Sequence, residues 1–347
     1  MGWRCTVLTL LLLVSASTPA QSEKGATPSQ CTATGDLEIR EVKSAIFHNT
    51  RKLRILLPAG YHQVKNADTR YPVLYLNDGQ NLFDVCTAIF GPKEWQVDET
   101  ADRLIAEGKV QPLIIVGIDN AGRHEKERLE QERLVGSRPN EYLPFPDDAL
   151  DPYIAHVHGA NYPRFLTREV MPFIERNYRA KAGPENTGLG GSSYGGLITF
   201  YTALHTQGVF GRVLIESPSF YVKGYAVLKQ AAKHKDWPAR IYFGGGTEES
   251  PPDSPEKFPQ EGIAQAVKLL QANGVSADRI LVNITPGHHD EDAWAARFPA
   301  ALTFLFPSKP WERHCRRLDI DAVVTLVKSF RGSSLREVAS GQGVTTR

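Results

Sequence analysis

The amino-acid sequence predicts an α/β fold with a mainly parallel central sheet and helices on both of its faces. Short apolar runs, such as residues 112–118, show no alternation of polar and apolar side chains, which is typical of strands buried on both faces. These runs alternate along the chain with amphipathic stretches of helical period, such as residues 162–178, and this order indicates strand–helix–strand units. A chain of 347 residues is long enough to bury a full core, as one large domain or two small ones.

The first half of the chain supplies the predicted N-terminal strands and one helix. Residues 38–57 alternate apolar and polar side chains, which predicts strands joined by a hairpin at residues 48–51. Residues 71–76 and 112–118 are compact apolar runs of strand length. Between them we expect a helix over about residues 94–106, because apolar side chains recur there at helical spacing.

The second half of the chain alternates strands and helices more regularly. An amphipathic helix is expected over residues 162–178, and a short strand and a second helix flank residue 193. The later predicted strands cover residues 212–217, 240–246 and 279–284, and the later predicted helices cover residues 263–272, 293–306 and 320–330. No internal repeat is visible, so the pattern predicts one α/β domain followed by an extension.

The N-terminus has the pattern of a secretory signal peptide. A positive charge at Arg4 precedes an almost wholly apolar run, and small residues follow up to Ala20. The run is too short to span a bilayer, so we expect a secreted or periplasmic protein with no membrane span after cleavage. The predicted organisation is a signal peptide at residues 1–20, a leader at 21–36, an α/β domain at 37–307, and a partly helical or disordered extension at 308–347.

Charge and cysteine usage narrow the classes of partner. The net charge is +1 and the chain has no basic stripe, so nucleic acid is not an expected partner. No cysteine lies at a metal-ligand spacing, and we expect neither a metal nor a cofactor. Cleavage leaves Cys31, Cys86 and Cys315, which allow at most one internal disulfide. A Cys31–Cys315 bond and three unpaired thiols both remain open, and the sequence does not predict the oligomeric state.

The most informative motif is Gly-Ser-Ser-Tyr-Gly at residues 191–195. It fits the G-x-S-x-G pattern, in which a strand turns sharply into a helix and lifts a serine out of the turn. The following helix directs its N-terminal N–H groups at any oxyanion formed beside that serine. Ser193 is therefore the candidate nucleophile, and a tight turn without a catalytic role is the alternative.

A base and an acid for this serine are available further along the chain. His288 and His289 follow the last predicted strand, where an imidazole can act as general base. The candidate acids follow the preceding strand, and each could instead be a surface charge: Glu248, Glu249 and Asp253. The order serine, acid, histidine is that of α/β-hydrolases, and differs from the order in chymotrypsin or subtilisin.

Two backbone N–H groups are candidates for the oxyanion hole. One belongs to Tyr194, the residue after the nucleophile. The other belongs to Gln80, in the loop after the strand that ends at Leu76, where Gly79 lets the backbone turn tightly. A simple turn at Asp78-Gly79 is the alternative.

Several segments together resemble one known family. They are residues 71–83 (Tyr-Pro-Val-Leu-Tyr-Leu-Asn-Asp-Gly-Gln-Asn-Leu-Phe), 94–98 (Glu-Trp-Gln-Val-Asp), 115–118, 138–144 (Arg-Pro-Asn-Glu-Tyr-Leu-Pro), 191–196, 246–249 (Gly-Thr-Glu-Glu) and 289–294 (His-Asp-Glu-Asp-Ala-Trp). Over residues 37–306 the chain resembles the esterase branch of the α/β-hydrolases. This branch includes enterochelin-type trilactone esterases, feruloyl esterases and S-formylglutathione hydrolase.

The resemblance implies roles for particular residues. It places the nucleophile at Ser193, the base at His289 rather than His288, and the acid at Glu249, with Glu248 left open. Gln80 and Tyr194 take the oxyanion positions. The residues implied to shape the pocket, as structural or as substrate-contacting groups, are Trp95, Arg138, Glu141 and Tyr142.

The expected function is therefore that of an exported serine hydrolase that cleaves carboxylic esters through an acyl-enzyme. The expected substrate is a small-molecule or carbohydrate-linked ester. Three alternatives remain open: an acyltransferase that uses the same three residues, an enzyme that hydrolyses a thioester or a siderophore trilactone, and a binding protein that keeps the fold without catalysis.

Overall fold

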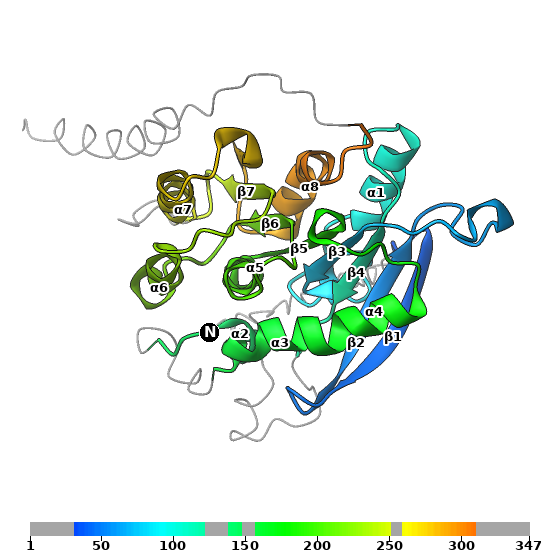
Figure 1. The fold of residues 1–347 in the computed structure, drawn as a ribbon, viewed down its shortest axis with the longest axis horizontal. Helices are drawn as coiled ribbons and strands as arrows, with labels where there is room; N and C mark the ends of the chain where they lie inside the picture. The colour runs from blue at the N-terminus through cyan, green and yellow to red at the C-terminus, as the bar shows by residue number, and fades with distance from the viewer. Residues whose placement is uncertain (1–30, 122–137, 148–156, 251–258, 310–347) are drawn as a thin grey trace, which may run out of the picture. The chain divides into compact units, whose positions relative to one another are not determined.

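An eight-stranded sheet forms the centre of the protein (Figure 1). The computed structural model describes residues 31–121, 138–147, 157–250 and 259–309. The chain divides into two compact units, Met1–Gln30 and Cys31–Arg347, and all described residues belong to the second.

The sheet is parallel except at one strand. Its strands are β1 (Asp36–Ser44), β2 (Asn49–Leu57), β3 (Val73–Asn77), β4 (Ile114–Ile118), β5 (Thr187–Ser192), β6 (Arg212–Glu216), β7 (Arg240–Gly246) and β8 (Ile280–Thr285). They lie in the order β1-β2-β4-β3-β5-β6-β7-β8. Only β2 runs against its neighbours β1 and β4, and the pairs from β4 to β8 are all parallel. The predicted mainly parallel sheet is confirmed.

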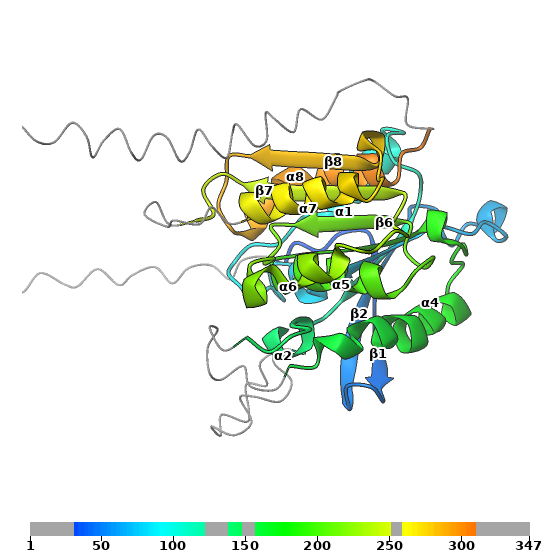
Figure 2. The ribbon, with the colours of Figure 1, turned by 60° about the vertical axis from the view of Figure 1, so that its left-hand side comes forward.

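Helices cover both faces of the sheet (Figures 1 and 2). They are α1 (Val97–Ala106), α2 (Arg138–Tyr142), α3 (Tyr162–Phe165), α4 (Met171–Asn177), α5 (Tyr194–His205), α6 (Val222–Ala231), α7 (Gln260–Ala272) and α8 (Glu291–Leu305). Side chains of α1 and α8 pack with Leu74 and Leu76 on one face, and those of α2 to α7 pack with Val73 and Tyr75 on the other. Adjacent residues of a strand point to opposite faces, so one buried strand contributes to both cores. This arrangement confirms the predicted α/β fold with helices on both faces.

The boundaries differ from the predicted ones where the backbone takes left-handed angles or the pattern is short. The hairpin turn occupies residues 45–48 instead of 48–51. Helix α1 begins at Val97, three residues later than expected, because Gln96 adopts φ 53° and ψ 44° before it. The sequence did not predict α2, which has five residues, or α6, where residues 223–225 depart from helical angles. The predicted helix over residues 320–330 lies outside the described residues.

A disulfide joins Cys31 to Cys86, with the two Cα atoms 5.2 Å apart. The Cys31–Cys315 bond considered from the sequence is therefore wrong, because Cys31 is already bonded, and so is the alternative of three free thiols. Spacing along the chain could not reveal this pairing, since the loop after β3 brings residue 86 back to the start of the domain. Within the described ranges, the structure contains no helix that is long and apolar enough to cross a membrane.

Candidate active site

Ser193 stands at the turn between β5 and α5. Its backbone has φ 58° and ψ −122°, a conformation that costs energy for any residue with a side chain. Hydrogen bonds from the β6 side hold the turn: Ser193 N donates to Glu216 O at 3.0 Å, and Ser219 N donates to Ser193 O at 3.2 Å. A β-carbon at Gly191 would lie 2.9 Å from the Asn77 side chain, which explains why the motif needs a residue without one.

His289 and Glu249 are hydrogen bonded to each other. His289 Nδ1 lies 2.7 Å from Glu249 Oε2, and the glutamate side chain is 1% exposed while the histidine is 39% exposed. His289 lies in the loop between β8 and α8, and Glu249 follows β7. The imidazole ring of His289 contacts Trp294 edge-on, with 5.1 Å between ring centroids. With Nδ1 bonded to the carboxylate, Nε2 is the ring nitrogen that can act as a base.

The neighbouring residues form a second, exposed pair. His288 Nδ1 lies 3.2 Å from Glu248 O, and its Nε2 lies 3.3 Å from Glu248 Oε2. The His288 and Glu248 side chains are 69% and 54% exposed, respectively. The structure thus pairs each histidine with one glutamate, and only the pair of His289 and Glu249 has a buried carboxylate. The remaining candidate acid, Asp253, lies outside the described residues.

The serine and the histidine are on loops at the same edge of the sheet, but they are not hydrogen bonded. The loops after β5, β7 and β8 carry Ser193, Glu249 and His289, and parallel strands end at one edge. The partner of Ser193 Oγ among the described residues is Ser219 Oγ, at 3.4 Å. Catalytic hydrogen bonds are often long or unformed without substrate and tighten when it binds.

A group of buried side chains surrounds the Glu249 carboxylate. Its Oε1 accepts a hydrogen bond from Ser217 Oγ at 2.7 Å and another from Gly246 N. Ser217 Oγ in turn accepts from Trp294 Nε1 at 2.9 Å, and Arg297 Nη2 lies 3.6 Å from Glu249 Oε1. These contacts fix the carboxylate in the orientation that meets His289 Nδ1.

A second carboxylate, Glu216, belongs to the same group. Arg297 Nε donates to Glu216 Oε1 at 2.8 Å, and both side chains are almost fully buried. Burial raises the pKa of Glu216 to about 7, although Arg297 opposes this shift. Ser217, Glu216 and Arg297 were not among the residues predicted from the sequence to belong to the site. One signal was available, since Arg297 is a charged residue on the apolar side of α8, beside Phe298.

The two candidate oxyanion donors lie at the ends of neighbouring strands β5 and β3. Helix α5 begins at Tyr194, so this N–H is among those that a helix leaves without an internal acceptor. Gln80 lies in a short 3₁₀ helix, Gly79–Asn81, directly after β3. Its side-chain Oε1 accepts a hydrogen bond from Asn120 N at 3.1 Å, which ties this loop to the end of β4.

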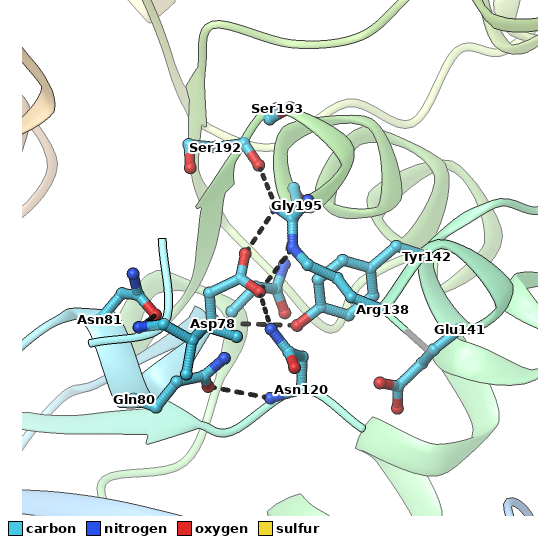
Figure 3. Close-up of polar contacts among 12 residues, drawn as sticks. Asp78, Gln80, Asn81, Asn120, Arg138, Glu141, Tyr142, Ser192, Ser193 and Gly195 are labelled. Atoms are coloured by element: carbon cyan, nitrogen blue, oxygen red, sulfur yellow. Dashed lines mark hydrogen bonds and ion pairs between the residues drawn. The ribbon is translucent and has the colours of Figure 1, made fainter. Parts of the chain in front are cut away.

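Arg138 of α2 links the loop after β3 to the serine turn, through an ion pair with Asp78 and a hydrogen bond to Ser192 O (Figure 3). Arg138 Nε and Nη2 lie 2.7 and 2.8 Å from the two carboxylate oxygens of Asp78, and Nη2 also donates to Ser192 O at 3.1 Å. Asn120 Nδ2 donates to Asp78 Oδ1 at 2.7 Å. Burial lowers the pKa of Arg138, but the Asp78 carboxylate outweighs it and raises this pKa above its usual value. Arg138 therefore stays cationic.

The remaining residues of the expected pocket are buried and contact other groups of the protein. Trp95 packs on Trp294 with 5.7 Å between ring centroids, and it is 3% exposed. Glu141 forms an ion pair with Arg51, and the Tyr142 hydroxyl accepts a hydrogen bond from Asp78 N at 3.2 Å. These contacts are with other parts of the protein, and the substrate-contacting role implied by the resemblance stays a prediction.

Potential metal-binding groups do not coincide with this site. Three sets of His, Cys, Asp and Glu side chains lie close enough together to hold an ion among the residues that the structure describes. None of the sets includes Ser193, Glu249 or His289.

Comparison with known proteins places most of the chain in one family. A family described as "Putative esterase" matches residues 44–305. The uncharacterized protein YbbA of Bacillus subtilis (strain 168) is 23% identical over 260 residues, which are 74% of this chain and 92% of that protein. An endo-1,4-beta-xylanase/feruloyl esterase of Xylanibacter ruminicola is 28% identical over 234 residues, which are 65% of this chain but only 26% of that longer protein.

Solved structures share the fold at low identity. A ferulic acid esterase aligns with a TM-score of 0.55 and 20% identity, covering 78% of this chain and 98% of its own. An enterochelin esterase from Shigella flexneri aligns with a TM-score of 0.56 and 20% identity, covering 79% of this chain and 60% of its own. Likeness at this identity establishes a common fold, and the chemistry has to be argued from the site itself.

Proposed function

Because the chain belongs to the esterase family over residues 44–305, we propose that it is a serine hydrolase that cleaves carboxylic esters through an acyl-enzyme. The observation that carries the proposal is the 2.7 Å hydrogen bond between His289 Nδ1 and the buried Glu249 carboxylate. This pair lies at the same sheet edge as Ser193, which is raised on a strained turn. The three side chains supply a nucleophile, an acid and a base, and their order along the chain (Ser193, Glu249, His289) is that of α/β-hydrolases.

In the acylation step, His289 Nε2 takes the proton of Ser193 Oγ as this oxygen attacks the carbonyl carbon of the ester. The N–H groups of Tyr194 and Gln80 donate hydrogen bonds to the resulting oxyanion. The tetrahedral intermediate collapses, the bond to the alcohol oxygen breaks, and the proton on His289 passes to that oxygen. A water molecule activated by the same imidazole then attacks the acyl-enzyme, which releases the carboxylic acid and restores Ser193.

Glu249 acts through His289 in this scheme. Its Oε2 accepts from the protonated Nδ1 and so selects the tautomer that leaves Nε2 unprotonated in the resting enzyme. The negative charge also stabilises the imidazolium that forms in each step. This role favours Glu249 over Glu248, whose partner His288 is exposed.

The proposed substrate is a small-molecule or carbohydrate-linked ester. Support comes from two similar proteins, one named as a feruloyl esterase and the other as an enterochelin esterase. An acyltransferase would use the same acyl-enzyme but pass the acyl group to an alcohol or a sugar. Product analysis with these acceptors present separates the two reactions, because only the transferase forms a new ester.

The protein is also proposed to be exported, with residues 1–20 removed. The Cys31–Cys86 disulfide supports this proposal, since such bonds persist in oxidising compartments. Fractionation of the producing cell, followed by mass analysis of the protein's N-terminus, tests it. Recovery of an uncleaved chain with reduced cysteines from the cytoplasm would contradict it.

A fluorophosphonate probe gives the most direct test of the mechanism. The probe reacts with activated serines, so mass mapping should locate it on Ser193. Labelling should be lost in Ser193→Ala and strongly reduced in His289→Ala, and Ser193→Ala should no longer turn over a short-chain aryl ester. A folded wild-type protein that takes up no probe would instead support the binding-protein alternative.

A further inference from the structure

Two buried carboxylates share one arginine behind the proposed catalytic pair. Glu216 ends β6, Glu249 follows β7, and Arg297 projects from α8. Their side chains are 2%, 1% and 1% exposed. Arg297 Nε lies 2.8 Å from Glu216 Oε1, while its Nη2 lies 3.6 Å from Glu249 Oε1. With all three ionised, the group carries one net negative charge, and the arginine lies closer to Glu216.

The surroundings of Glu216 leave little room for it to move. A β-carbon at Gly244 of β7 would lie 2.0 Å from Glu216 Oε2, so the carboxylate rests against the bare backbone of the neighbouring strand. Ser217 Oγ lies 3.3 Å from Glu216 Oε1 and 2.7 Å from Glu249 Oε1. Among the described residues, Tyr242 of β7 is a further titratable group that faces Glu216. Burial and the charge of Glu216 raise the pKa of Tyr242 well above its usual value. Tyr242 therefore stays neutral, and Arg297 and Glu249 are the charges that matter.

We propose that Glu216 is a positioning residue that holds Arg297 in an ion pair and thereby preserves the negative charge of Glu249 for the imidazolium of His289. The inference rests on the proposed function. Catalysis requires His289 to become positively charged, and an unpaired guanidinium beside Glu249 would oppose that charge. Glu216 neutralises the guanidinium without touching the histidine or the substrate.

The pKa of Glu216 is raised to about 7, so the negative charge that it offers to Arg297 is present mainly above that pH. Burial and the charge of Glu249 favour its protonated form, and Arg297 favours its ionised form. Replacing a buried ion pair by apolar side chains often costs little stability. Stability alone therefore does not require Glu216 and Arg297 at this place. The pair instead lies one hydroxyl, Ser217, away from the proposed catalytic acid.

The variant Glu216→Gln tests the proposal because it keeps the shape and removes the charge. Arg297 is then free to pair more closely with Glu249, which disfavours the imidazolium form of His289. The ascending limb of kcat/KM against pH should move to lower pH by about one unit. The plateau of kcat should fall by roughly three- to tenfold with KM unchanged, because ground-state contacts to the substrate remain.

Two further variants separate charge from shape. The double variant Glu216→Gln with Arg297→Gln removes one charge of each sign, so the ascending limb should return close to its wild-type position. Glu41→Gln removes an exposed carboxylate of β1, on the far side of the strand order, and should leave the pH profile where it is. If the double variant does not fold, the pH profiles of Glu216→Gln and of the control Glu41→Gln still test the proposed role of Glu216.

Fluorophosphonate labelling of the wild-type protein distinguishes failure of the proposed function from failure of the proposed role of Glu216. Absence of labelling at Ser193 would overturn the proposed function, and this inference with it. Labelling of Ser193 together with identical pH profiles for wild type and folded Glu216→Gln would overturn the inference alone. A loss of activity in Glu216→Gln without any shift of the limb would show a structural role and would also contradict the proposal.

Discussion

Arg138 binds both carboxylate oxygens of Asp78, at 2.7 and 2.8 Å, and a third contact joins the same guanidinium to Ser192 O at 3.1 Å. Asp78 precedes one proposed oxyanion donor, Gln80, and Ser192 precedes the nucleophile. The ion pair therefore fixes the distance between the two loops that must meet at the oxyanion (Figure 3). An arginine is needed because its planar fork makes all three contacts at once.

Arg138→Lys is expected to lower kcat by about ten- to a hundredfold while the protein stays folded. A lysine keeps the charge but cannot contact both oxygens of Asp78 and Ser192 O together, so the oxyanion donors lose their fixed spacing. Steady-state kinetics with an aryl ester measures the effect. Arg40→Lys, at an exposed ion pair on β1, is the control, and equal activity of the two variants would contradict the assigned role.

Ser193→Gly is expected to be more stable to unfolding than Ser193→Ala by about 1 kcal/mol. The serine has φ 58°, where a side chain is strained and glycine is not. Both variants lack the hydroxyl, so the comparison isolates the backbone term. Urea unfolding of the two proteins measures it, and equal midpoints with equal slopes would show that the turn is relaxed.

Stability is expected to fall as pH rises from about 4.5 to about 7, in part because of Glu94. Burial raises the pKa of Glu94 to about 7, from an ordinary value of 4.5. Between these values the folded state keeps a proton that the unfolded state has released, so the free energy of unfolding decreases with pH.

Glu94→Gln removes this titration. Its free energy of unfolding should depend less on pH in this range, by at most about 1 kcal/mol per pH unit. Thermal or urea unfolding from pH 4.5 to 7.5 measures the slope. Glu107→Gln, a surface carboxylate at the other end of α1, is the matched control. A Glu94→Gln slope equal to that of wild type would count against a shifted Glu94.

Cys86→Ser is expected to lower the free energy of unfolding by about 2–4 kcal/mol. The Cys31–Cys86 bond closes a segment of 55 residues and restricts the unfolded chain. Cys315→Ser keeps both bonded cysteines and serves as the control. Non-reducing peptide mapping should recover the Cys31–Cys86 peptide, and equal stability of the two variants would contradict a structural disulfide.

The sequence predicted the strands of the sheet more accurately than the helices and turns that connect them. The short run at residues 240–246 marked a buried strand with correct bounds, because three apolar residues at strand length are followed there by glycines that end the pattern. Helix α6 escaped detection because its angles break at residues 223–225. The family was recognised from motifs because the glycines and polar residues of the turns are dictated by local geometry. The assignments of Ser193, His289 and Glu249 remain predictions until labelling and kinetics test them.

The sequence by itself determined the fold class, the nucleophile motif, two adjacent candidates for the base and three nearby candidates for the acid. These features depend on neighbours within a few residues, through periodicity, turn geometry and spacing. Tertiary structure decided which histidine meets which glutamate, which cysteines bond, and that Glu216 and Arg297 lie behind Glu249. His289 and Glu249 are 40 positions apart, and Arg297 and Glu216 are 81 positions apart. Only the register of β6, β7 and β8, with α8 packed against them, brings such distant side chains within hydrogen-bonding distance.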